Sequence, residues 1–114
     1  MCEVFAGQPR ENYEPITRNL RLNGQSTSIR LERSFWRIID LMAEEEGVST
    51  PLFLSTLHSE VIEIHGEAKN FTSLLRCACL KKMQLIKANA TPSFVKEAFP
   101  ICDKNEILYR NFVM

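Results

Sequence analysis

The chain has no hydrophobic run long enough to cross a membrane, and this absence excludes a helical membrane protein. Its longest apolar runs are only four or five residues, whereas a membrane-spanning helix needs about 20. The first residues, MCEVFAGQPRENYEP, contain neither a basic n-region nor an apolar h-region, so we expect no secretory signal. Together these absences predict a soluble protein of the cytoplasm.

The sequence also lacks any C-x-x-C spacing among its four cysteines. On a helix, Cys77 and Cys79 lie about 200° apart and cannot bind the same metal ion. We therefore expect all four to be reduced thiols in a reducing compartment: Cys2, Cys77, Cys79 and Cys102.

Features of an enzyme are missing as well. No glycine-rich phosphate loop, nucleophile elbow or H-E-x-x-H motif occurs. His58 and His65 are seven residues apart, but no third ligand has a compatible spacing, so a metal site is not expected. The sequence thus predicts a protein without catalytic residues, metal or cofactor.

Net charge is zero, yet the charges are unevenly distributed along the chain. Residues 38–67 contain seven acidic side chains and no lysine or arginine, whereas residues 68–114 contain eight basic and three acidic ones. Local rather than total charge determines which ligands a surface attracts. Residues 16–37 contain five arginines and a single acidic residue, Glu32, and form the most basic segment around the predicted strands. The arginines are Arg18, Arg21, Arg30, Arg33 and Arg37.

Alternation of polar and apolar residues from 18 to 31 predicts two short strands. Asn23-Gly24 lies between them and is a strong signal for a two-residue hairpin turn. Pairing Leu22 with Gln25 separates two faces. One face then carries Asn19, Arg21, Ser26, Ser28 and Arg30, and the other carries Leu20, Leu22, Thr27, Ile29 and Leu31.

Three helices are predicted after the strands. The first contains Phe35, Ile38, Ile39 and Met42 at helical spacing and ends at Gly47, with Glu32 and Ser34 as acceptors near its start. The second begins after Ser49, tolerates Pro51 in its first turn and ends at Gly66, with the apolar stripe Phe53, Leu54, Leu57, Val61 and Ile64. The third runs from Phe71 to about Lys87, and a short helix is expected after Thr91-Pro92.

The order of strand, helix, Gly-x-Ser turn and longer helix resembles the ribbon-helix-helix DNA-binding domain. The matching segment is STSIRLERSFWRIIDLMAEEEGVSTPLFLSTLHSEV, residues 26–61, and the stretches NGQSTSIRLERSFW and NFTSLLR are similar to a larger bacterial subfamily of mostly unassigned function. The resemblance implies a mainly α fold with a short β-ribbon, an intertwined dimer and an added C-terminal helical region. We therefore expect an N-terminal arm over residues 1–17, a core over 18–66 and a helical extension packed on it over 67–114.

The resemblance also implies a site and partners. As a homodimer the chain would place its ribbon in the major groove of double-stranded DNA. The expected function is that of a transcriptional regulator, and more specifically of a repressor. Base-reading residues are expected at Ser26, Ser28 and Arg30, and phosphate contacts at Ser49, Thr50, Arg33, Arg21 and Arg18. The dimer core is expected to contain Ile29, Leu31, Phe35, Trp36, Ile39, Leu54, Leu57 and Val61, on the argument that a single chain would leave this strand and helix face in water.

One local feature competes with this interpretation. If residues 18–22 pair on the outside of the ribbon, a dimer has four strands and is about 15 Å wide, against a major groove of about 12 Å. Residues 18–22 are then either a mobile arm that follows the DNA backbone or part of a sheet used for assembly. The alternative function is accordingly an antitoxin-like interaction module that binds a protein partner through its apolar C-terminal region.

Overall fold

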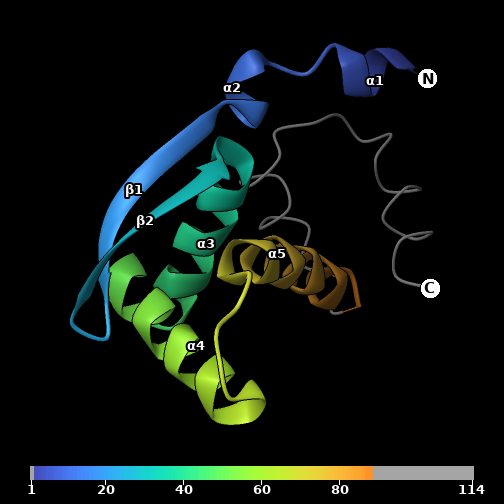
Figure 1. Ribbon diagram of the computed structural model, residues 1–114. Helices are drawn as coiled ribbons and strands as arrows, with labels where there is room; N and C mark the ends of the chain where they lie inside the picture. The colour runs from blue at the N-terminus through green and yellow to red at the C-terminus, as the bar shows by residue number, and fades with distance from the viewer. Residues whose placement is uncertain (1, 89–114) are drawn as a thin grey trace. The chain divides into compact units, whose positions relative to one another are not determined.

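The described part of the protein is mostly helical and contains one β-hairpin near its N-terminal end (Figure 1). The computed structural model describes residues 2–88. In chain order the elements are α1 (Cys2–Ala6), α2 (Arg10–Tyr13), β1 (Pro15–Leu22), β2 (Gln25–Glu32), α3 (Arg33–Glu45), α4 (Thr50–His65) and α5 (Phe71–Ala88). A short ribbon followed by helices, with a further helix after them, confirms the predicted mainly α fold with a short β-ribbon and an added helix. The short helix expected after Thr91-Pro92 lies outside the described residues.

The hairpin forms in the predicted register. Leu22 pairs with Gln25, and the antiparallel ladder continues to the pair Pro15 and Glu32. Asn23 and Gly24 have φ angles of 55° and 84°, as a two-residue turn with two positive φ angles requires. β1 begins at Pro15, earlier than the expected Arg18, so the segment predicted as an arm contains α1, α2 and the first residues of this strand.

Helix α3 follows β2 without an intervening loop, and its start differs from the expectation. Its N-cap Glu32 makes no side-chain capping hydrogen bond, and Ser34 Oγ instead donates to Asn12 O, 2.6 Å away. The predicted glycine end is confirmed, since Gly47 has a φ of 71° and its N–H donates to Glu44 O. The buried residues of this helix are Trp36, Ile38, Ile39 and Ala43.

Helix α4 begins and ends as predicted. Ser49 Oγ accepts a hydrogen bond from Leu52 N, Pro51 lies in the first turn, and Gly66 closes the helix with a φ of 84°. Of the predicted apolar stripe, Leu54 and Val61 are buried within the single chain, whereas Ile64 is 75% exposed.

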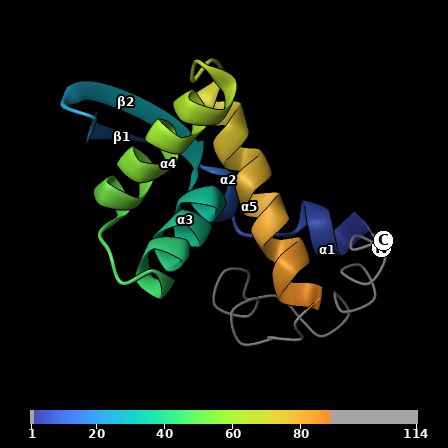
Figure 2. The ribbon, with the colours of Figure 1, turned by 90° about the horizontal axis from the view of Figure 1, so that it is seen from below.

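The chain divides into two compact units, residues 1–72 and 73–114. Within the first unit, the hairpin lies along one side of α3 and α4 (Figure 1; Figure 2). The second unit contains nearly all of α5, whose buried residues recur at helical spacing as Leu75, Cys79, Met83 and Ile86. Between residues 2 and 88, no helix combines the length and the apolar character that a membrane crossing requires.

The cysteines of α5 differ sharply in environment, and this generates a prediction. Cys79 is buried, which raises the pKa of its thiol to about 12, whereas Cys77 is exposed. Because only the thiolate reacts with alkylating reagents, iodoacetamide at pH 8 should modify Cys77 and leave Cys79 unmodified in the native protein. Peptide mass spectrometry with and without denaturant measures both sites, and equal native rates at Cys77 and Cys79 would contradict the prediction.

Candidate nucleic-acid interface

The hairpin exposes one polar face to solvent. Successive side chains of a strand point to opposite faces, so the register brings alternate residues of β1 and β2 together on the side away from the helices. None of the six central residues of this outer face is acidic, and all six are exposed: Thr17, Asn19, Arg21, Ser26, Ser28 and Arg30.

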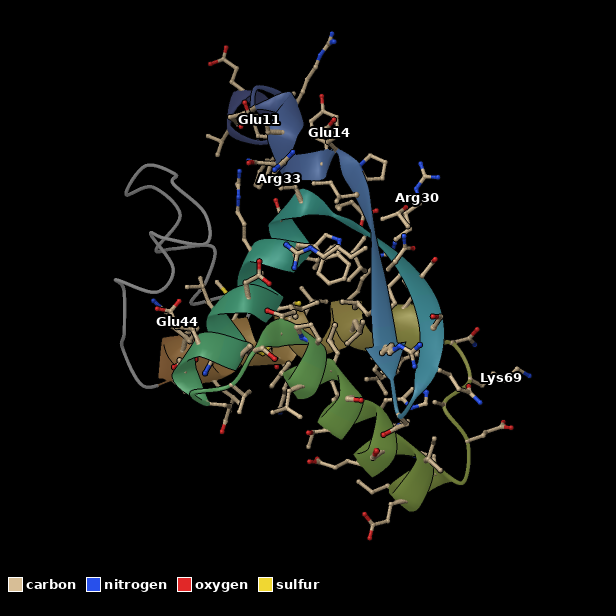
Figure 3. All side chains as sticks on the ribbon, turned by 90° about the vertical axis from the view of Figure 1, so that its left-hand side faces the viewer. Glu11, Glu14, Arg30, Arg33, Glu44 and Lys69 are labelled. Atoms are coloured by element: carbon tan, nitrogen blue, oxygen red, sulfur yellow. The ribbon has the colours of Figure 1, made fainter. Side chains whose placement is uncertain are left out.

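Three cross-strand pairs make up the centre of the outer face. Thr17 lies opposite Arg30 near the base of the hairpin, and Arg21 lies near the turn, where its Nη1 donates to Gly24 O over 3.2 Å. Between them, Ser28 Oγ donates to Asn19 Oδ1 over 2.6 Å. The Arg30 side chain extends away from the helices (Figure 3), so its guanidinium is accessible to a ligand.

Arg18, for which a DNA phosphate contact is predicted, faces the helices. Its two terminal nitrogens donate to the two carboxylate oxygens of Asp40 on α3, over 2.8 and 3.0 Å. The guanidinium also lies 4.3 Å from the centre of the Trp36 ring. The hydrogen bond with Asp40 raises the pKa of Arg18, and partial burial, which acts in the opposite direction, does not cancel this effect. Both terminal nitrogens of Arg18 are therefore engaged by one carboxylate within the chain.

The same carboxylate connects a third element. Thr50 Oγ1, in the first turn of α4, donates to Asp40 Oδ1 over 2.8 Å. Asp40 therefore connects α3 to β1 through Arg18 and to α4 through Thr50, in each case by hydrogen bonds between side chains. Trp36 adds another link between α3 and β1, because its Nε1 donates to Ile16 O over 2.8 Å.

The turn of the hairpin is fixed to the middle of α4. Asn23 N donates to Ser55 Oγ, and Asn23 Oδ1 accepts from Ser59 Oγ, both over 2.8 Å. Asn23 Nδ2 lies 2.9 Å from His58 Nδ1, whose ring also meets the edge of Phe71. His58 thus has a structural role, and among residues 2–88 no group of three potential metal ligands occurs.

Arg33 and the start of α4 are less open than the outer face. Arg33 Nη2 lies 3.4 Å from Glu14 Oε2 at the base of the hairpin (Figure 3), and the buried Arg33 Nε has no partner among the described residues. At the start of α4, Pro51 has no amide hydrogen and Leu52 N is already bonded to Ser49 Oγ. Few amides are therefore left near Ser49 and Thr50 to hold a phosphate.

The residues predicted for a dimer core are largely buried within a single chain. Ile29 is 3% exposed and Leu31 is fully buried, and the same holds for Trp36, Ile39, Leu54 and Val61, whereas Phe35 and Leu57 are half-buried. This corrects the argument that one chain would leave the strand in water: β1 pairs with β2, and the chain covers the apolar side of the hairpin itself.

Sequence reasoning assigned no role to two residues of the outer face, Thr17 and Asn19. Both belong to β1. The base-reading residues are predicted only on the following strand, because in the resembled family each chain contributes one strand to the ribbon. The signal that identifies them is the Asn23-Gly24 turn, since its register places Asn19 opposite Ser28 and Thr17 opposite Arg30.

Comparisons with known proteins agree with this architecture. The family model of the ribbon-helix-helix domain matches residues 15–83. A solved structure, that of an uncharacterized protein from Bordetella pertussis Tohama I, is similar to this chain with a TM-score of 0.74 and 34% sequence identity, over 95% of this chain and 86% of that one. No curated protein matches the chain.

The interactions of Asp40 generate a stability prediction. Asp40→Ala removes the acceptor of two Arg18 bonds and one Thr50 bond, and we expect a loss of about 1–3 kcal/mol in the free energy of unfolding because both partners stay partly solvated. Chemical denaturation measures this loss. As a control, Glu14→Ala removes the single longer contact with Arg33 and should cost about 0.5 kcal/mol or less; equal losses in the two variants would contradict the prediction.

Proposed function

This chain belongs to the ribbon-helix-helix family, and from that premise we propose that it is a DNA-binding regulator that contacts duplex DNA with the outer face of its hairpin. Members of the family are typically non-enzymatic, and ribbon-helix-helix domains generally form dimers that bind DNA. The observation that carries the proposal is the centre of the outer face, with two exposed arginines, four neutral hydrogen-bonding side chains and no acid among its six residues. The next residue of β2 on this face, Glu32, is half-buried at the start of α3.

The dimensions of the hairpin support groove binding by one chain. Paired strands lie about 5 Å apart, so two strands with their side chains fit a major groove about 12 Å wide. The inner face is covered by the helices while the outer face is exposed. The ribbon that meets DNA in this proposal is therefore β1 and β2 of one chain.

Side-chain chemistry suggests a role for each group. Arg30 has a two-pronged donor without a partner among residues 2–88, and this donor suits O6 and N7 of guanine. Ser26 and Ser28 discriminate bases less. Arg21, held near the turn, and Arg33, at the base of the hairpin, suit phosphates that flank the groove. Ser49 and Thr50 contribute less, because Pro51 has no amide hydrogen and Leu52 N is already bonded to Ser49 Oγ.

Pairing of two copies along β2 competes with groove binding. The hydrogen bond from Arg33 N to Glu14 O, together with the register, fixes the phase of the ladder. The backbone groups of Ser26, Ser28 and Arg30 therefore point to the open edge of β2. Joining two such edges gives four strands about 15 Å across, wider than the groove. We therefore propose a dimer that associates elsewhere and keeps each hairpin two strands wide.

The open edge also favours a second candidate, an interaction or assembly module. Antiparallel pairing of β2 with its copy keeps polar and apolar faces matched when one residue lies on the two-fold axis. Ile29 on that axis sets Ser28 opposite the Arg30 of the second copy and avoids the repulsion of facing arginines. In that state the sheet serves assembly rather than DNA binding.

Substitution of two arginines on the outer face tests the proposed DNA contacts. Arg30→Ala should weaken binding to a duplex enriched from a randomised library by about 1–3 kcal/mol, because it removes a two-pronged base contact. Arg21→Ala should weaken binding to all duplexes and lower the slope of log affinity against log salt by about 0.9, as for one lost phosphate contact. Fluorescence anisotropy at several salt concentrations measures both effects.

The matched control is Arg10→Ala, which removes an exposed arginine of α2 that belongs to neither strand. Its affinity should equal that of the unmodified protein within about twofold, since Arg10 is not a residue of the outer face. Absence of duplex binding by the unmodified protein at about 50 mM salt, or equal losses in the three variants, counts against the proposed function.

A second prediction concerns the open edge of β2. In amide hydrogen exchange measured by NMR, the amides of Thr27, Ile29 and Leu31 should be protected, because they donate to β1, while those of Ser28 and Arg30 should exchange rapidly. Protection of Ser28 and Arg30 that increases with protein concentration would instead support strand-paired assembly and the second candidate.

A further inference from the structure

The centre of the outer face is a pair of short polar side chains from different strands. Asn19 on β1 lies directly opposite Ser28 on β2, and both are exposed. The phase of the ladder makes this a pair without backbone hydrogen bonds between its members, in which opposite side chains come closest. Their contact is short, with Ser28 Oγ donating to Asn19 Oδ1 over 2.6 Å.

This contact orients the Asn19 amide without exhausting it. The Ser28 proton occupies one lone pair of Asn19 Oδ1, and a carbonyl oxygen has two. Asn19 Nδ2 carries two further donors and has no hydrogen-bond partner within residues 2–88. An exposed and oriented amide therefore presents an acceptor and a donor side by side.

Adenine presents the complementary pair in the major groove, with its N6 amino group as donor and N7 as acceptor, and asparagine recognises it through two hydrogen bonds. We propose that Asn19 is the adenine-reading residue of this protein, and that Ser28 positions its amide. The inference rests on the proposed DNA binding and adds a reader from β1, the strand to which sequence reasoning gave no base contact.

The same geometry indicates where the adenine lies relative to guanine. Arg30 is two residues from Ser28 along β2, and two residues of a strand span about 6.6 Å. Successive bases are about 3.4 Å apart along the duplex axis. An adenine read by Asn19 and a guanine read by Arg30 are therefore expected about two base steps apart.

Selection from a randomised duplex library tests the assignment. The unmodified protein should enrich one adenine that Asn19→Ala no longer enriches. Asn19→Asp should shift the preference at that position toward cytosine, because a carboxylate accepts from the cytosine N4 amino group but cannot donate to N7. Gln8→Ala, which removes an exposed amide outside the hairpin, should retain the adenine.

A second measurement isolates the hydrogen bond to N7. Replacing the selected adenine by 7-deazaadenine removes one of the two hydrogen bonds and should weaken the unmodified protein roughly 2- to 12-fold, the range of a single hydrogen bond. Asn19→Ala should be insensitive to this replacement, since a lost interaction cannot be lost twice. Ser28→Ala should reduce the adenine preference by less than Asn19→Ala, as befits a positioning residue.

Two outcomes overturn the proposal and are distinguishable. If the unmodified protein enriches no duplex, the proposed DNA binding fails together with this inference. If it enriches a sequence, but Asn19→Ala keeps the same adenine or loses as much affinity to 7-deazaadenine as the unmodified protein does, the DNA-binding function stands and only the role of Asn19 is refuted.

Discussion

Pairing of β1 with β2 inside one chain is the constraint on which the rest of this structure depends. An isolated strand can neither satisfy its backbone groups nor bury one face, and here the partner strand comes from the residues just before the turn. The pairing helps cover Ile29 and Leu31 without a second copy. It also sorts the side chains of both strands into two faces in one step, because neighbours along a strand point in opposite directions.

The inner face illustrates how a charged residue is accommodated beside a core. Arg18 breaks the apolar pattern of its face, and its charge is balanced by the bidentate contact with Asp40 and by the Trp36 ring. These contacts, with the hydrogen bonds of Asn23 to α4, hold both the middle and the turn of the hairpin on the helices. The outer face consequently stands on a fixed support, which a reader of base edges requires.

Strand number connects the architecture to function. Two strands suit the width of a major groove and four do not. Because each chain already contains a two-stranded hairpin, dimerisation along the open edge would give a sheet too wide for the groove. In a ribbon made from one strand per chain, dimerisation creates the reading element. In this chain the reading element is complete beforehand, and edge pairing would obstruct it.

The sequence alone determined the local features of this protein. The Asn23-Gly24 turn, the hairpin register, the Ser49 cap and the glycine ends of α3 and α4 follow from residues at most a few positions apart, since backbone preferences and strand alternation are local properties. Only the tertiary structure decided that Arg18 meets Asp40 rather than solvent. Arg18 and Asp40 are 22 residues apart, and whether they meet depends on how α3 approaches the sheet, which no periodicity within either segment specifies. The same holds for the buried Ile29 and Leu31, whose covering depends on how the elements of the chain pack together rather than on the strand that contains them.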